Sequence, residues 1–163
     1  MLVVEEAKLS DIERLSELLT VLFSKEAEFT PNPDVQKEGL RMILEDTSVG
    51  TVLVLKNEQN IIGMVSLLWT ISTALGGRVA FLEDMIIEPS WQGKGAGSLL
   101  VEYAIAYAKQ VTCKRITLLS DIDNDDAHRF YKRFGFANSV MQPMRLLLHE
   151  KNEISRLEKL NEK

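Results

Sequence analysis

The sequence predicts a mixed α/β (α+β) fold built on one sheet, and three observations support this prediction. Short apolar runs separated by turn residues fill the first half of the chain, which indicates antiparallel strands. A strand, a helix and another strand then follow in order, which is the pattern of a parallel crossover. The length of 163 residues and the hydrophobic content of 45% suit a single core. We therefore expect one domain over residues 1–149, followed by a charged tail over residues 150–163.

The first elements are a strand and two helices. The apolar run 2–5 predicts a strand. Ser10 and Glu13 have the spacing of a capping box at a helix start, and apolar residues recur at helical spacing as far as Phe23. Two prolines in the stretch 30–33 break the chain, and a second helix is expected over 34–45.

Three antiparallel strands come next. The runs 52–55 and 61–69 lie on either side of a polar turn and predict a hairpin. A third strand is expected over 79–87. It ends before Pro89, because proline has no N–H to donate to a central ladder.

The second half of the chain contains the crossover. An apolar helix precedes a strand, and Asn124 can cap the helix that ends near Gly135. Together with two closing strands, this gives about seven strands and about four helices; the elements of this half are expected at 98–110, 116–119, 125–134, 136–140 and 144–148. The tail 150–163 is either a further helix or a solvated end.

Composition narrows the function classes. The net charge is −5 and no Lys/Arg cluster stands out, so no nucleic-acid partner is expected. No apolar run approaches the length of a membrane span, and we expect neither a signal peptide nor a membrane partner. The single cysteine, Cys113, fits a cytoplasmic location. His128 and His149 lack partners at metal-ligand spacing, so no metal is expected.

A glycine loop between the strand 79–87 and the helix 98–110 is the first functional signal. A helix start with glycines beside it binds anions, because its backbone N–H groups are unpaired and glycine admits close approach. Ser98 replaces the last glycine of a dinucleotide fingerprint, and Ala96 replaces the Ser or Thr of a P-loop. Taken alone, the loop leaves an anion site and a simple turn equally open; its residues are Gln92-Gly93-Lys94-Gly95-Ala96-Gly97.

A second motif favours the anion site. The run Asn124-Asp125-Asp126-Ala127-His128-Arg129-Phe130-Tyr131-Lys132-Arg133-Phe134-Gly135-Phe136 follows about 39 residues after Gln92. The spacing Gln92-x-x-Gly95-x-Gly97 and this run resemble the two signature motifs of the GNAT superfamily of N-acetyltransferases. The resemblance covers roughly 81–136 and implies a GNAT-like, mostly antiparallel twisted sheet.

The resemblance also implies a cofactor site for acetyl-CoA. It assigns the pantetheine arm to the strand edge before the loop, and the pyrophosphate to the loop and helix start. Residues of the second motif complete the site, although Asn124 has a helix cap as its alternative role. The implied cofactor-binding residues are Met85, Ile86, Ile87, Gln92, Gly93, Lys94, Gly95, Ala96, Gly97, Ser98, Asn124, Ala127, Phe130 and Tyr131.

The implied catalytic residues are Tyr131, Glu83 and Asp84. Tyr131 matches the usual general acid of the family, with a core aromatic as the alternative. Glu83 and Asp84 are adjacent acids in an apolar strand, where burial is costly unless they are paired or functional. The Leu-Glu-Asp triplet resembles that of polyamine acetyltransferases, in which the Glu is a proposed base. Glu83 is therefore the first candidate and Asp84 the second, with a carboxylate paired to Arg78 or to a polar group of another strand as the alternative.

The predicted function is N-acetyl transfer from acetyl-CoA to a primary amine, with a small-molecule amine favoured. Two other readings stay open: a non-catalytic acyl-CoA-binding sensor or scaffold, and an acetyltransferase acting on protein lysines or N-termini. The resemblance implies that the acceptor site is built from about 23–33 and 141–145, which carry no substrate motif. A second copy of the chain is a candidate partner in a homodimer.

Overall fold

The computed structural model describes residues 1–26 and 28–148. They form two compact units, residues 1–125 and the part that begins at Asp126. A five-stranded mixed sheet organises the first unit, in the order β1-β2-β3-β4-β5. Neighbouring strands are antiparallel except β4 and β5, which are parallel. The strands are β1 (Leu2–Glu6), β2 (Gly50–Asn57), β3 (Asn60–Ser72), β4 (Gly77–Ile87) and β5 (Ile116–Leu118).

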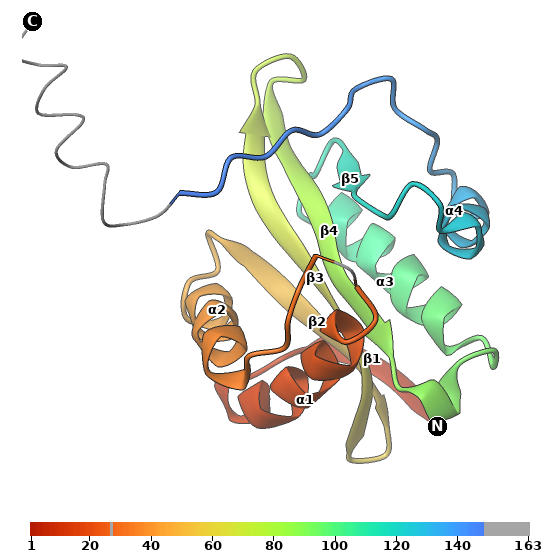
Figure 1. Ribbon diagram of the computed structural model, residues 1–163. Helices are drawn as coiled ribbons and strands as arrows, with labels where there is room; N and C mark the ends of the chain where they lie inside the picture. The colour runs from red at the N-terminus through yellow and green to blue at the C-terminus, as the bar shows by residue number, and fades with distance from the viewer. Residues whose placement is uncertain (27, 149–163) are drawn as a thin grey trace, which may run out of the picture. The chain divides into compact units, whose positions relative to one another are not determined.

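Three helices cover the two faces of this sheet. The first two, α1 and α2, lie on one face, and α3 lies on the other (Figure 1). A fourth helix, α4, spans the boundary into the second unit. The helices are α1 (Ile12–Phe23), α2 (Pro33–Glu45), α3 (Ala96–Gln110) and α4 (Asp125–Lys132), with short 3₁₀ turns at Leu9–Asp11 and Pro89–Trp91. No helix among the described residues is long and apolar enough to cross a membrane.

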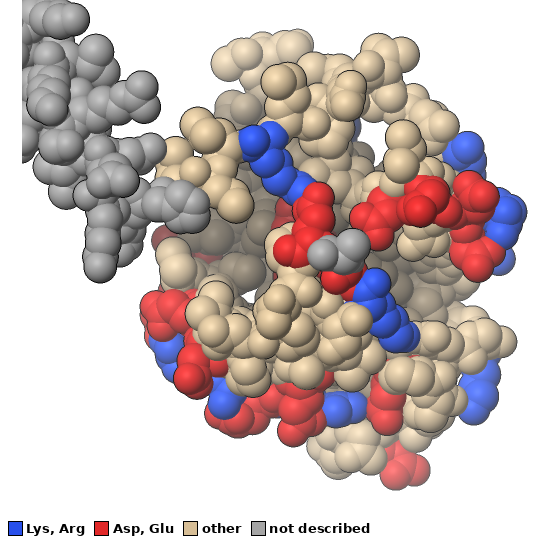
Figure 2. Space-filling view, in the orientation of Figure 1, with Lys and Arg blue, Asp and Glu red and all other residues tan. Residues whose placement is uncertain are grey.

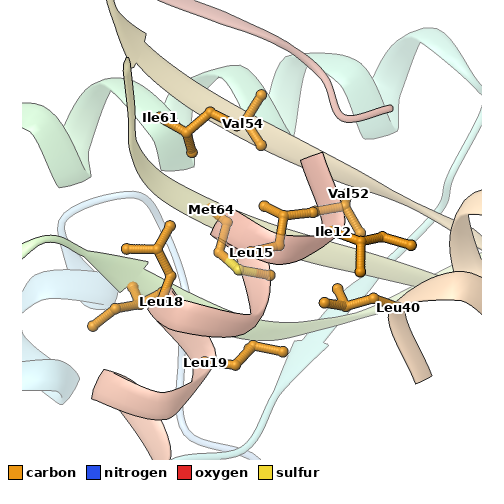
Figure 3. Close-up of a cluster of buried hydrophobic side chains, with 10 residues drawn as sticks. Ile12, Leu15, Leu18, Leu19, Leu40, Val52, Val54, Ile61 and Met64 are labelled. Carbon is orange, nitrogen blue, oxygen red and sulfur yellow. The ribbon is translucent and has the colours of Figure 1, made fainter. Parts of the chain in front are cut away.

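The core between α1, α2 and the sheet follows from the helical spacing of the apolar residues. Leu15, Leu18 and Leu19 lie on one face of α1 and are almost fully buried. Leu15 lies beside Met64 and Val52 of the central strands in Figure 3, and Leu18 and Leu19 belong to the same cluster. Burial of one such side chain contributes about 1.5–3 kcal/mol, so this layer fixes α1 against β2 and β3.

Polar contacts fix the two ends of this layer. Gln36 of α2 is buried, and its amide donates to the carbonyl of Ser16 at 3.0 Å, which joins α2 to α1. Arg14 donates to Glu88 at 2.9 Å and to the carbonyl of Ile61 at 3.0 Å. Because Glu88 directly follows β4, this contact ties the end of β4 to α1.

A β-bulge interrupts β4. Ser66 pairs with Glu83 and Met64 pairs with Ile86, so two residues of β4, Asp84 and Met85, lie opposite one residue of β3. Asp84 has a φ of +52°, a left-handed conformation that is uncommon for residues other than glycine. The bulge therefore changes the direction of the side chains in the last part of β4.

The predicted mixed α/β fold is confirmed, as is the hairpin of β2 and β3. The helix cap predicted at Ser10 is wrong. A 3₁₀ turn at Leu9–Asp11 precedes α1, and the carboxylate of Asp11 accepts from the backbone N–H of Lys8 at 2.8 Å.

The predicted count of about seven strands is too high. The segments 136–140 and 144–148 are described but form no strand. Ser139 accepts a local hydrogen bond from the backbone of Met141 at 3.1 Å, which competes with strand pairing. Pro143 has no N–H to donate to a ladder. His149 and the tail expected over 150–163 lie outside the described residues.

Candidate functional site

The glycine loop leads from β4 into α3 with two left-handed glycines. Gly93 has a φ of +71° and Gly95, at the N-cap of α3, has a φ of +84°. Added Cβ atoms at these positions would meet no atom within 4 Å, so the space beside them is open. No side chain caps this helix start, and the first N–H groups of a helix have no carbonyl partner inside it. Gly93, Lys94, Gly95, Ala96, Gly97 and Ser98 therefore form a backbone surface suited to an anion such as a pyrophosphate.

Two side chains of this region hold the loop in place. The amide of Gln92 donates to the carbonyl of Ile87 at 2.8 Å, so it joins the loop to the end of β4. The ammonium of Lys94 lies 5.5 Å from the ring centroid of Trp91, a distance at which a cation–π interaction is favourable. The contact of Gln92 with Ile87 positions the loop, and the cofactor role of Gln92 stays a prediction.

The last part of β4 has an unpaired edge. β5 pairs with β4 only at Ala80, Phe81 and Leu82, and no described strand continues the ladder beyond them. The backbones of Met85, Ile86 and Ile87 pair with β3 on one side or lie in the bulge, and their opposite edge stays open. An extended ligand can bind such an edge as an added strand. The fit with a pantetheine arm is therefore good.

Asp84 and Glu83 lie where this unpaired edge begins. Burial raises the pKa of Asp84 to about 6, and the charges of Glu83 and Glu26 reinforce the shift. Glu83 is exposed. The alternative that Glu83 pairs with Arg78 is wrong, because neither residue forms an ion pair among the described residues. Of the two adjacent acids, Asp84 has the properties of a base at neutral pH.

Further acidic residues surround this position. Burial raises the pKa of Glu26, as do the charges of Asp121, Glu28 and Glu83. The connection between α1 and α2 crosses in front of β4 in Figure 1, and acidic side chains gather at the same place in Figure 2. We call Glu26, Glu28, Glu83, Asp84 and Asp121 the acidic group. Among the described residues, no three His, Cys, Asp or Glu side chains have an arrangement that would hold a metal ion.

Ser66 lies opposite Glu83 in the register of β3 and β4, and its side chain is on the same face of the sheet. It is fully buried, and its Oγ atom has no hydrogen-bond partner in the described structure. Buried hydroxyl groups almost always have a partner. A polar group that reaches this face beside Glu83 would supply one.

The residues of the second motif lie at or in α4. Asn124 directly precedes this helix, in the N-cap position, and Ala127, Phe130 and Tyr131 are half-buried on it. The ring of Tyr131 packs edge-on against Phe130 at 5.1 Å and Phe136 at 5.6 Å. Burial raises the pKa of Tyr131 to about 12. Its phenol is therefore protonated at neutral pH and can donate a proton.

The first unit thus brings together Glu83, Asp84, the unpaired edge of β4 and the glycine loop. Sequence reasoning missed the contribution of Glu26, Glu28 and Asp121. The only signal for the first two was their position in the segment 23–33 expected to line the acceptor site. Asp121 carried no signal, because its proximity to Glu26 arises only on folding.

Comparisons with known proteins identify the family of the chain. The model of the acetyltransferase (GNAT) family matches residues 12–136. The chain is 29% identical to the aminoalkylphosphonate N-acetyltransferase of Salmonella typhimurium over 103 residues. This match covers 63% of this chain and 66% of that protein. It is also 31% identical to the aminoglycoside N(6')-acetyltransferase type 1 of Stenotrophomonas maltophilia over 58 residues. That match covers 36% of this chain and 38% of that protein. The chain thus spans less than two thirds of the length of either relative.

A solved structure shares the fold. It is a predicted acetyltransferase with acetyl-CoA from Clostridium acetobutylicum, with a TM-score of 0.74 and 19% identity. The match covers 92% of this chain and 99% of that one.

Proposed function

The chain belongs to the acetyltransferase (GNAT) family, and on this premise we propose that it transfers the acetyl group of acetyl-CoA to the primary amine of a small molecule. The observation that carries the proposal is the combination, in one unit, of an uncapped glycine-rich helix start, an unpaired strand edge and a half-buried acid. The helix start suits the pyrophosphate of coenzyme A and the strand edge suits its pantetheine arm. The half-buried acid suits the amine. The single cysteine is in keeping with a cytoplasmic enzyme.

Binding of acetyl-CoA is assigned to backbone groups first. The N–H groups from Gly93 to Ser98 would hold the pyrophosphate, and the open edge of Met85, Ile86 and Ile87 would hold the pantetheine arm. Asn124, Ala127 and Phe130 are proposed to complete this site. Acetyl-CoA supplies the thioester that the amine attacks.

We assign the general base to Asp84 in preference to Glu83. The acceptor must lose a proton before its nitrogen can attack, and a base works best when its pKa lies near the working pH. The pKa of Asp84, about 6, meets this condition. Glu83 then contributes negative charge beside the amine.

We assign the general acid to Tyr131. Attack of the amine breaks the carbon–sulfur bond and leaves a thiolate, which needs a proton. The phenol of Tyr131 carries its proton at neutral pH, since its pKa of about 12, raised by burial, lies far above 7. Its family motif supports this role.

The acidic group favours an acceptor with more than one positive charge. Five carboxylates near one position attract cations and repel phosphate or phosphonate groups. Of the two relatives named above, the aminoglycoside enzyme acts on a substrate of the favoured charge. We therefore propose a small amine that carries at least two ammonium groups.

A substrate panel tests this proposal. The protein is incubated with acetyl-CoA and spermidine, an aminoglycoside, an aminoalkylphosphonate or a lysine-containing peptide, and release of free thiol is followed. We expect fast release with a polycationic amine, and a loss of about 10²-fold or more in kcat in Tyr131→Phe. Thiol release with the aminoalkylphosphonate alone would contradict the proposal that the acceptor carries more than one positive charge. Binding of coenzyme A without release by any amine would favour the non-catalytic reading, and release by the peptide alone would favour a protein substrate.

A further inference from the structure

A cavity lies at the end of α3 opposite to the glycine loop. It has a volume of about 430 Å³, within the range of small-molecule sites. Five elements of the first unit contribute to it, namely β1, β2, β3, β4 and α3, together with the end of α2. Its polar and aromatic walls include Glu6, Thr51, Trp69, Arg78 and Tyr107.

Two nearly parallel rings form one wall of this cavity. The indole of Trp69 and the phenol ring of Tyr107 have an interplanar angle of 6° and centroids 6.5 Å apart. Both residues are half-buried, so part of each ring is accessible. Parallel aromatic surfaces favour a planar ring as their ligand, because stacked rings attract one another.

Arg78 supplies an unpaired positive charge beside these rings. The central carbon of its guanidinium lies 5.2 Å from the ring centroid of Trp69. It forms no ion pair among the described residues, although it is half-buried. A guanidinium binds carboxylate or phosphate oxygens in pairs, and a partly desolvated one binds them more strongly.

The other charge on the wall, Glu6, already has partners. Its carboxylate accepts from the hydroxyl of Tyr107 at 2.5 Å and from the hydroxyl of Thr51 at 3.3 Å. Burial, together with this contact to Glu6, raises the pKa of Tyr107, so the phenol remains a donor. Glu6 thus positions Tyr107, and Arg78 is the charge left for a ligand.

The cavity is separate from the site of acetyl transfer. Tyr107 lies about 16 Å along α3 from Ala96 at the glycine loop, at 1.5 Å per residue. Arg78 lies about 20 Å along β4 from Asp84, at roughly 3.3 Å per residue. A ligand in this cavity would therefore be distinct from the acceptor amine.

We propose that this cavity binds a small planar aromatic anion, whose ring stacks on Trp69 and Tyr107 and whose negative group pairs with Arg78. Both an aromatic carboxylate and a nucleoside monophosphate have this chemistry. Benzoate and adenosine monophosphate are the two probes that distinguish these sources, and the uncharged benzamide and adenosine are their matched controls.

Calorimetric titration of the full chain gives the first test. We expect at least one of the two anions to bind at millimolar concentration or below, and its uncharged analogue to bind at least about tenfold more weakly. Arg78→Gln should weaken the anion to a similar degree. Arg41→Gln removes a charge from the exposed face of α2 and should leave binding unchanged. Equal binding of the uncharged analogue, or no binding of either anion, would overturn the proposal.

The two tryptophans of the chain allow a second test, because Trp69 lines the cavity and Trp91 lies beside the glycine loop. In Trp91→Phe, the emission of Trp69 should change when the anion is added. In Trp69→Phe, the remaining Trp91 should respond to coenzyme A, and the anion should no longer change the emission. An anion response that persists in Trp69→Phe would contradict the cavity assignment. A missing response to coenzyme A would concern only the proposed acetyl transfer.

Discussion

Asp84 has both an unusual backbone and an unusual protonation state. Its φ is +52° within the bulge of β4, and burial raises the pKa of its carboxyl to about 6. Such strain costs about 1–3 kcal/mol and is found mainly at functional sites. Asparagine also tolerates this conformation, so Asp84→Asn removes the charge and leaves the backbone unchanged.

Asp84→Asn should lower kcat/KM by about 10²–10³-fold, because an amide cannot accept the proton of the amine. Steady-state rates from pH 5 to 9 measure this effect. In the wild type, kcat/KM should fall as the pH drops through about 6, and the variant should lack this limb. The matched control is Glu83→Gln, for which we expect a loss of only a few-fold. A larger loss in Glu83→Gln than in Asp84→Asn would reverse the assignment.

Asp84→Asn should also stabilise the protein at high pH. The folded-state pKa of Asp84, about 6, lies above the ordinary value of 3.8 for this carboxyl, so ionisation costs stability. The cost is absent below pH 3.8 and is complete above about pH 6. At roughly 1.4 kcal/mol per pKa unit, it amounts to about 1–3 kcal/mol. Urea unfolding should therefore show Asp84→Asn more stable than the wild type at pH 8 and equally stable at pH 3.5; equal stability at pH 8 would contradict the raised pKa.

The negative charges near Asp84 should also contribute to its raised pKa. Burial is the larger cause of the raised pKa, and Glu26 contributes a smaller part. Glu26→Gln should move the acidic limb of kcat/KM to lower pH by a fraction of a unit, because a nearby negative charge is removed. Glu38→Gln on the exposed side of α2 is the control. A limb that moves equally in both variants would indicate a general effect of net charge.

At the scale of an element, α3 depends on the left-handed Gly95 at its start. Gly95→Ala should destabilise the protein by about 1–2 kcal/mol, although the new Cβ meets no atom, because a φ of +84° strains an alanine. The affinity for coenzyme A should fall as well. Thermal unfolding and calorimetric titration measure the two effects.

Gly39 of α2 is the matched control for Gly95, because it has no left-handed backbone angle. It lies inside a helix with open space at its Cβ position. Gly39→Ala should stabilise the protein by about 0.5–1 kcal/mol, since alanine favours the helix. Destabilisation by both substitutions would show that the backbone angle at Gly95 is not the cause.

Elements with local signals were predicted well from the sequence. The hairpin of β2 and β3 and the start of α3 near its glycines follow from neighbouring residues, and the structure has both. The cap predicted at Ser10 is absent because a 3₁₀ turn at Leu9–Asp11 precedes α1, and Asp11 bonds to the backbone N–H of Lys8 before that turn. The bulge was hidden, because 79–87 is apolar except for Glu83 and Asp84, so it has no alternation whose break would mark a bulge before the pairing with β3 is known. The acidic group was hidden for a similar reason, since Glu26 and Asp121 are distant in sequence.

At the scale of the whole molecule, the segment 140–148 contains a series of exposed apolar side chains. Their exposed fractions run from 68% at Leu148 to 103% at Val140, and no strand ladder uses their backbone among the described residues. Exposed apolar stretches of this kind mark association surfaces. We propose that a second copy of the chain covers this segment, since two identical extended segments can pair with each other about a two-fold axis; its large apolar residues are Val140, Met141, Met144, Leu146, Leu147 and Leu148.

Sedimentation velocity tests this proposal. The wild type should sediment as a dimer, and the double variant Leu146→Ser, Leu148→Ser should shift toward the monomer. The matched control is Ile122→Ser, which removes a single exposed apolar residue of the first unit. A wild type that is monomeric at every concentration, or a variant that remains fully dimeric, would refute the homodimer.

The bulge in β4 has a consequence for the length of the chain itself. Because Asp84 and Met85 share one position opposite β3, Glu83 and Ile86 lie on the same face of the sheet although they are three residues apart. Side chains on a regular strand alternate between two faces, so loss of one of the two bulge residues would restore regular pairing and keep Ile86 opposite Met64. A frame-preserving loss of the codon for Asp84 should therefore remove the carboxylate and the bulge together, while the later side chains of β4 and the glycine loop stay on their side of the sheet.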